Sequence, residues 1–280
     1  MAAGPIVTLT TDFGVSDAFA GTMKGIVYSI NPNARVVDIT HDIPAQDIKT
    51  GAFIFDSAYH YFPPGTVHVL VIDPDVGTNR RAIVVESPDA YFACPDNGLL
   101  SYAYMRGGGT LADAAPFEAA NVGLPDGWKA YHLTNHQYWH HPVSSTFHGR
   151  DVFAPVAGHL TAGVAPSAMG AAIESVTAFA IPQPEPRGDR LVGRVMHVDR
   201  FGNLITNLKA QDVFMPDAHT VIELAGKRMA GLASSYQDGP PYKGIIGSHG
   251  YLEIAAANAN AAAMLGVGVG DEVVVGTVGA

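Results

Sequence analysis

Apolar positions along the first 180 residues alternate between the period of a strand and that of a helix. Residues 6–9 form a short apolar run. Apolar residues follow at positions 19, 23, 26, 27 and 30, which is the spacing of one helix face, and Asp17 is expected to cap this helix. Residues 34–39 predict a second strand, and residues 47–61 a second helix. Repeated strand–helix units of this length are typical of a largely parallel sheet with right-handed crossovers.

The next predicted strand, residues 67–72, is apolar at nearly every position and is interrupted by His68. Runs of this kind usually lie in a sheet that is covered on both faces. The sequence therefore predicts an α/β fold for the first part of the chain.

The pattern changes after residue 180. Residues 181–189 are rich in proline and poor in core residues, as in a linker. Beyond them the chain offers strands and few helices, which predicts a small β-barrel or sandwich over residues 190–280. The alanine-rich residues 255–263 fit either a short helix or a loop. The expected strands are residues 191–198, 220–224, 251–255 and 272–278.

Composition narrows the class of protein. The chain has 280 residues, and its hydrophobic fraction of 48% is ordinary for a globular protein. A net charge of −10 argues against nucleic acid as the main partner, because phosphate binding needs a basic surface. No apolar stretch approaches the roughly 20 residues of a membrane span, and residues 1–5 lack the features of a signal peptide. The single cysteine, Cys94, excludes an intrachain disulfide, and these features together predict a cytoplasmic protein.

Several common sites are missing from the sequence. There is no Walker phosphate loop, no G-x-G-x-x-G that opens a helix after a strand, and no serine in a G-x-S-x-G turn. The histidines His136, His140 and His141 match no zinc pattern, and a polar surface loop accounts for them better. Cys94 precedes Pro95 in a strand-like run, so we expect a small core residue rather than a nucleophile.

Charged residues lie where predicted strands give way to turns. Asp12 follows the first strand and Asp73 the third, and in a parallel sheet ligands bind beyond this edge. The tight turn after Asp73 has the length to return Arg80 toward that carboxylate. Other interpretations fit Asp12 and the Asp73–Arg80 pair equally, as a turn cap and a surface ion pair. Spacing alone favours His148 as a residue that flanks a helix.

A set of motifs in fixed order covers nearly the whole chain. Each motif is weak alone, but the ordered set resembles the SAM hydroxide adenosyltransferases, also called SAM hydrolases, where SAM is S-adenosyl-L-methionine. These enzymes are related to the bacterial fluorinase and chlorinase. The matching segments are residues 11–14 with 17, 23–25, 36–41, 43–44, 46–48, 72–78 with 80–81, 95–100, 146–155, 199 with 201–203 and 206–207, and 247–255.

The resemblance implies an N-terminal α/β/α domain, residues 1–180, and a smaller C-terminal β-barrel domain, residues 190–280. It also implies a homotrimer in which the N-terminal domain of one subunit and the C-terminal domain of a neighbour complete each active site. The implied activity is hydrolysis of SAM to adenosine and L-methionine, with no metal ion and no organic cofactor.

The family's functional residues carry over to matching positions of this chain. Its catalytic Asp-Arg-His set corresponds to Asp73, Arg80 and His148, which would orient and deprotonate a water molecule. Asp12 matches the carboxylate that binds both ribose hydroxyls. The other implied substrate contacts are Phe201, Asn203, Tyr251 and Ala256 on the adenine side, and Asp17, Asp199, Ser248 and Glu253 around the methionine or nucleoside.

Two positions depart from the pattern of the family. His249 stands where the halogenating relatives carry an arginine near the substrate carboxylate, and Asp75 replaces a more usual glycine. Within the family, the alternative function is a SAM-dependent halogenase, although an aspartate at position 73 would repel a halide ion. A non-catalytic adenosine- or SAM-binding protein is the alternative from another class, although binding alone has no need of an ordered Asp-Arg-His set.

Overall fold

The computed structural model describes residues 4–111, 114–213, 220–238 and 240–277. The chain divides into two compact units, Met1–Ile181 and Pro182–Ala280. Two expectations fall partly outside the described residues. They are the absence of a signal peptide, which concerns residues 1–3, and the end of the last expected strand at Val278. Within these ranges, no helix has the length and apolar character needed to cross a membrane.

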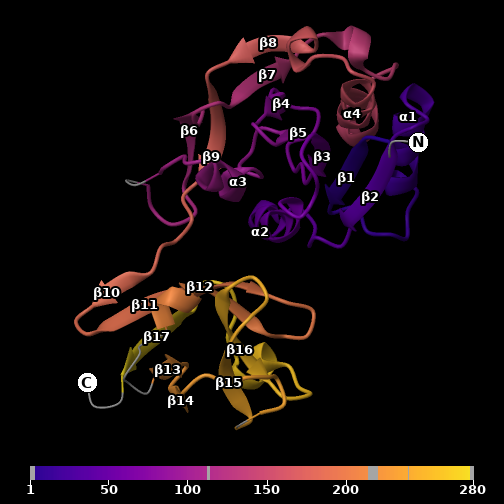
Figure 1. The fold of residues 1–280 in the computed structure, drawn as a ribbon. Coiled ribbons are helices and arrows are strands. Elements are labelled where there is room, and N and C mark those ends of the chain that lie inside the picture. The colour runs from indigo at the N-terminus through magenta and orange to yellow at the C-terminus, as the bar shows by residue number, and fades with distance from the viewer. Residues whose placement is uncertain (1–3, 112–113, 214–219, 239, 278–280) are drawn as a thin grey trace. The chain divides into compact units, whose positions relative to one another are not determined.

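A seven-stranded sheet runs through the first unit in the order β2-β1-β3-β5-β4-β7-β8 (Figure 1). The pairs among β2, β1, β3 and β5 are parallel, as the strand–helix pattern predicted, whereas β4, β7 and β8 extend the sheet by antiparallel pairs. A separate ribbon pairs β6 with β9. The strands are β1 (Ile6–Thr11), β2 (Arg35–Thr40), β3 (Thr66–Val71), β4 (Ala82–Glu86), β5 (Ala90–Pro95), β6 (Ala119–Gly123), β7 (Lys129–Leu133), β8 (Gly170–Ile173) and β9 (Ser175–Phe179).

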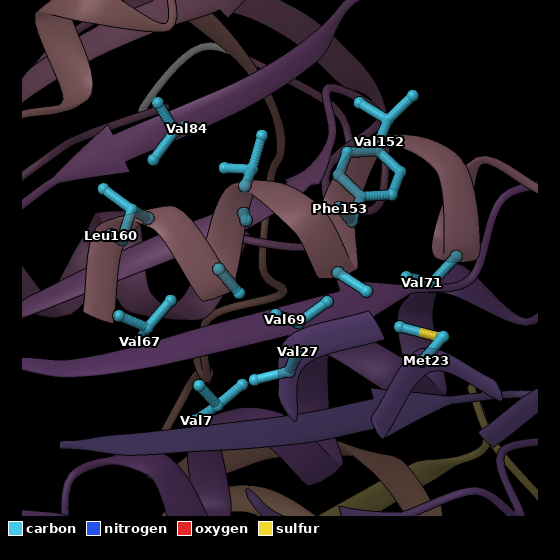
Figure 2. Close-up of a cluster of buried hydrophobic side chains, with 14 of the residues drawn as sticks. Val7, Met23, Val27, Val67, Val69, Val71, Val84, Val152, Phe153 and Leu160 are labelled. Carbon is cyan, nitrogen blue, oxygen red and sulfur yellow. The ribbon is translucent and has the colours of Figure 1, made fainter. Parts of the chain in front are cut away.

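Helices cover both faces of this sheet, so the first unit has the α/β/α layers that were expected. On one face, Met23 and Val27 from α1 and Leu160 from α4 pack against strand valines such as Val69 (Figure 2). On the other face, α2 and α3 cover a second apolar cluster. All six residues of β3 are buried between the two layers. The helices are α1 (Phe19–Ile30), α2 (Ile48–Tyr59), α3 (Ser101–Arg106) and α4 (Ala154–Thr161).

The two long helices begin differently. The carboxylate of Asp47 accepts the N–H of Thr50 at 3.0 Å and caps α2. Helix α1 begins after Ala18 without a side-chain cap, so the expectation that Asp17 caps it is wrong. The side chain of Asp17 is exposed instead.

The chain enters α4 through one π-helical turn, Gly149–Phe153, in which the N–H of Ala154 bonds to the carbonyl of Gly149. Such turns are rare and often lie at functional sites. His148 is the residue directly before it. Two 3₁₀ turns, His136–Tyr138 and Pro166–Ala168, complete the helical segments of this unit.

Antiparallel strands build the second unit in the order β14-β13-β17-β11-β12-β16-β15, and β10 pairs with β11. A bridge between Leu232 and Gly244 links the two ends of the sheet, which therefore nearly closes into the expected barrel. Part of the stretch expected as a linker forms β10. The strands are β10 (Glu185–Arg187), β11 (Arg190–Val198), β12 (Leu204–Lys209), β13 (Thr220–Leu224), β14 (Lys227–Ala230), β15 (Tyr242–Ile246), β16 (Tyr251–Ala256) and β17 (Glu272–Thr277), and the short helices are α5 (Ala210–Val213) and α6 (Ala261–Leu265).

Candidate active site

Asp12 and Asp73 lie at the same edge of the sheet, because they follow the neighbouring parallel strands β1 and β3. A pocket of about 370 Å³ opens at this edge, and both residues line it. His148 lines the same pocket from the loop before the π-helical turn. Three residues from distant parts of the first unit therefore meet around one pocket.

Arg80 joins Asp73 to His148. Its Nε group donates to both carboxylate oxygens of Asp73, at 2.9 and 3.0 Å, and its Nη2 group bonds to Oδ2 of the same carboxylate. The side chains of Asp73 and Arg80 are 4% and 9% exposed, so this is a buried pair and not the surface ion pair considered above. The guanidinium also lies over the ring of Phe153, 5.5 Å from its centre.

The contact between Arg80 and His148 defines the state of the imidazole. Nη2 of Arg80 lies 2.8 Å from Nδ1 of His148. Because a guanidinium only donates, Nδ1 accepts, and a neutral ring then carries its proton on Nε2. Burial lowers the pKa of His148, and the charge of Arg80 lowers it further, against the opposing effects of Asp73 and Asp151. His148 therefore offers an N–H donor at Nε2.

Close backbone packing places the loop of Asp73 beside the segment of His148. Gly77 has φ of +78°, and a Cβ on this residue would lie 2.1 Å from the carbonyl oxygen of Ser145. In the same segment, the N–H of Ser144 donates to the buried carboxylate of Asp151 at 2.8 Å. The segment that leads to His148 is therefore held at two neighbouring residues.

Asn97 fixes the start of the same loop from another strand. Its Nδ2 group donates to the carbonyl of Ile72 at 2.9 Å, and Ile72 directly precedes Asp73. The position of Asp73 thus depends on the turn that follows β5.

The turn that contains Asp12 is bound to the loop after β2. The N–H of Gly14 bonds to the carbonyl of His41 at 2.7 Å. The N–H of Gln46 donates to Oδ2 of Asp12 at 2.8 Å. Under the turn, the hydroxyl of Thr11 lies 2.8 Å from Nδ1 of His41.

Three phenylalanines form one wall of the pocket, and the sequence did not predict this. The ring centres of Phe13, Phe19 and Phe147 lie 5.0 to 5.7 Å apart. Phe19 was assigned to the buried face of the first helix, but it is 44% exposed because it lies at the first position of that helix. The sequence indicates the exposure of Phe19 only by its place, one helical turn before Met23 at the start of the apolar pattern.

The second unit has a pocket of its own, of about 640 Å³. Asp199, Phe201, Asn203 and Ala256, four of the expected substrate contacts, line it. The ring of Phe201 is 76% exposed. Asp199 is occupied within its own turn, because its carboxylate accepts the backbone N–H groups of Phe201 and Asn203 and the side-chain amide of Asn203, at 2.8 to 2.9 Å.

Other expected contacts are absent from the linings of both pockets. Ser248 is exposed in the turn before β16, Tyr251 begins that strand, and Asp17 is exposed near α1. Glu253 is buried and accepts the hydroxyl of Tyr236 at 2.8 Å, and burial raises its pKa.

Tyr236, which lines the pocket of the second unit, was missed by the sequence reasoning. Burial, together with the carboxylate of Glu253, raises the pKa of Tyr236 to about 12. Because the residue lies in an irregular segment without a strand or helix period, its sequence carries no signal for this contact.

Neither a metal site nor a reactive thiol emerges from the described ranges. Within them, no three His, Cys, Asp or Glu side chains gather closely enough to hold a metal ion. Cys94 is buried, as predicted, and burial raises the pKa of its thiol.

Comparison with known proteins places this geometry in a family. Sequence profiles of the SAM hydroxide adenosyltransferase N-terminal and C-terminal domains match residues 7–170 and 193–274. The (R)-S-adenosyl-L-methionine hydrolase of Salinispora arenicola is 35% identical over 97% of this chain and 98% of its own length. A fluorinase of Actinoplanes is more distant, at 27% identity over 75% of this chain and 73% of its own.

A solved structure agrees with the sequence matches. The crystal structure of a conserved protein from Thermotoga maritima superposes with a TM-score of 0.82 at 30% identity, and the match covers 97% of this chain and 99% of the other. The two domain profiles and the full-length relatives agree along nearly the whole sequence. The chain belongs to the SAM hydroxide adenosyltransferase family.

Proposed function

We propose that this protein hydrolyses SAM to adenosine and L-methionine, the activity for which its Salinispora relative is named. The observation that carries the proposal is the buried contact of Arg80 with both Asp73 and His148, beside a pocket that Asp12 also lines. A site for adenosine binding alone has no use for a carboxylate and an imidazole held together in this way.

The substrate needs no general acid, because its methionine half leaves as a neutral thioether. What the site must supply is a water oxygen in line with the C5′–S bond. In this proposal Asp12 binds the two ribose hydroxyls and so fixes C5′. Positioning of this kind contributes on the order of 7–11 kcal/mol in favourable cases.

Asp73 and His148 then have separate roles toward the water molecule. The Nε2–H of His148 donates to the water oxygen and leaves a lone pair directed at C5′. As the O–C5′ bond forms, the C5′–S electron pair passes to sulfur and the water proton passes to Asp73. Asp73 is the proton acceptor in this scheme because Arg80 occupies Nδ1 of His148 and Nε2 already carries a proton. Arg80 holds the carboxylate in place through its hydrogen bonds to both oxygens.

The aromatic wall suits a sulfonium ion. Phe13, Phe19 and Phe147 line the pocket together with two carboxylates, and a cation is attracted both to ring faces and to negative charge. A halide would instead meet the buried carboxylate of Asp73, which makes the halogenase alternative the weaker one.

We assign the remaining contacts, and the assembly, to the same proposal. The pocket of the second unit would bind the adenine side through Phe201, Asn203, Ala256 and the nearby Tyr251. The other expected contacts, Asp17, Asp199, Ser248 and Glu253, would surround the methionine or nucleoside. In a cytoplasmic homotrimer, residues 1–180 of one subunit and residues 190–280 of a neighbour would complete each site.

The test is turnover of SAM in water enriched in heavy oxygen, with and without chloride, bromide or fluoride. We expect adenosine labelled at its 5′ oxygen and an equal amount of methionine, and no halonucleoside even at high halide concentration. Unlabelled adenosine would point to another route. A substantial yield of 5′-halo-5′-deoxyadenosine would establish the halogenase, and tight binding without turnover would establish the binding protein.

A further inference from the structure

Gln46 has an unusual backbone conformation at the rim of the pocket. Its φ is +66°, in the left-handed region that residues with a Cβ rarely adopt. The residue lies in the loop between β2 and α2, and it lines the pocket together with Asp12 and Asp73. Unfavourable backbone conformations of this kind cluster at functional sites.

The conformation directs one main-chain group at Asp12. The N–H of Gln46 donates to Oδ2 of Asp12 at 2.8 Å. The next two N–H groups turn back into the loop itself, that of Asp47 to Pro44 and that of Ile48 to Gln46. Of these three consecutive amides, only that of Gln46 reaches the turn after β1.

The side chain of Gln46 has no comparable role. Within the part of the chain that the structure describes, its amide makes no hydrogen bond, and Oδ1 of Asp12 accepts none either. A carboxylate has about four acceptor positions. With one of them occupied by Gln46, Oδ1 and the second lone pair of Oδ2 stay available for a pair of hydroxyls.

We propose that Gln46 is a positioning residue whose main-chain N–H sets the orientation of the Asp12 carboxylate for a vicinal diol. The terminal torsion of an aspartate is broad, so an unrestrained carboxylate would rotate. One fixed oxygen turns it into a bidentate acceptor with a defined direction. The inference rests on the proposed function, in which Asp12 binds the ribose of SAM.

Three substitutions separate the main chain from the side chain. Gln46→Gly removes the side chain but favours the left-handed conformation and keeps the N–H. Gln46→Ala also keeps the N–H, at a conformational cost. Gln46→Val brings a β-branched side chain, which strongly disfavours this conformation. A main-chain role predicts that function declines in the order Gly, Ala, Val, whereas a side-chain role predicts similar losses in all three.

The readout is the ratio of kcat/KM for SAM to that for its 2′-deoxy analogue, because a merely structural defect would lower both alike. We expect Gln46→Gly to keep the wild-type ratio. In Gln46→Val we expect the ratio to fall roughly tenfold or more, mainly through KM for SAM, as for the loss of a hydrogen bond to a charged group. Thermal unfolding checks that each variant is folded. If Gln46→Val is not folded, Gln46→Ala replaces it as the variant in which the left-handed conformation is disfavoured.

Calorimetry with adenosine and 2′-deoxyadenosine separates this inference from the proposed function, because it requires no turnover. Asp12→Ala should abolish the preference for adenosine. If Asp12→Ala keeps that preference, Asp12 does not bind the diol, and the ribose assignment fails. If Asp12→Ala loses the preference while Gln46→Val and Gln46→Ala keep it, the role of Gln46 is overturned and the proposed function stands. The same holds if Gln46→Gly loses the preference as much as Gln46→Val and Gln46→Ala do.

Discussion

Nη2 of Arg80 donates to Nδ1 of His148 at 2.8 Å while it is also bound to Asp73. The charge that stabilises the carboxylate therefore also disfavours protonation of the imidazole. NMR titration should place the pKa of His148 below its usual 6.5, and Arg80→Met should raise it. His159 is the control, because burial alone lowers its pKa and the substitution should not change it. An unchanged His148 in Arg80→Met would contradict the contact.

The lowered pKa of His148 also sets the pH dependence of turnover. The neutral imidazole is the working form, so kcat/KM should stay level from neutral pH downward and fall only as the pH passes below the lowered pKa of His148. A rate that rises on acidification through this range would mean that the imidazolium is the active form.

Asp73→Asn removes the proton acceptor with little change of shape. Loss of a positioned acid–base group typically lowers a rate about 10²–10⁴-fold. Adenosine binding, measured by calorimetry, should change far less because Asp12 remains. Asp75→Asn is the matched control, since Asp75 is exposed in the same loop. Near-normal turnover in Asp73→Asn would show that the residue is structural.

Gly77→Ala tests the close approach of the two loops. Its Cβ would meet the Ser145 carbonyl at 2.1 Å, and relief of the clash must move the segment before His148. Gly65→Ala is the control, because Gly65 also has positive φ, +82°, but open space around the added Cβ. A left-handed alanine costs about 1–2 kcal/mol in either position. We expect the Gly77 variant alone to lose more stability than this and to lose turnover. Equal losses of stability and of turnover in the Gly77 and Gly65 variants would refute the clash.

His68 should make stability depend on pH. It is 1% exposed, its Nδ1 lies 2.7 Å from the Thr8 hydroxyl, and burial lowers its pKa to about 3. Between pH 6.5 and 3 the unfolded chain therefore binds a proton that the folded chain does not, so stability falls as the pH falls. The slope from this residue is about 1.4 kcal/mol per pH unit. Denaturant unfolding should show a slope smaller by that amount in His68→Asn. Equal slopes in both proteins would mean that folded His68 titrates normally.

The proposed trimer predicts complementation between inactive variants. Asp73→Asn damages the first unit and Asn203→Ala the second. If each site combines units of neighbouring subunits, random mixing restores about one quarter of the sites. If each site lies within one chain, mixing restores none. Light scattering should give about three times the 29.4 kDa of one chain.

The sequence predicted those parts of the site that follow from strand order. Asp12 and Asp73 follow apolar runs, and parallel neighbours bring such positions to one edge. The contact of Arg80 with Asp73 was predicted from the length of the tight turn between them. The antiparallel strands β4, β7 and β8 were not foreseen, because their pairing depends on contacts between distant segments.

Other features left no pattern in the sequence. Nothing in the residues around Gln46 indicates a left-handed backbone, and the partner of its N–H, Asp12, is far away in the chain. The rings of Phe19 and Phe147 meet because α1 and the segment before α4 are neighbours in space, although they are far apart in the chain. Asp199 was expected as a substrate contact by motif, but no pattern in the sequence indicated that its carboxylate also bonds to the backbone of the turn that follows it.

The π-helical turn after His148 has a consequence for how this chain tolerates insertions and deletions. A turn of this kind accommodates one residue more than an α-helical turn, and the extra residue lies between His148 and helix α4. Deletion of one residue from Gly149–Phe153 would restore regular helix and rotate His148 by about 100° relative to α4. The imidazole would then leave Arg80, although the composition and the strand order of the unit would stay nearly unchanged. In aligned relatives, a one-residue gap at this turn is therefore a sharper mark of altered chemistry than many substitutions elsewhere.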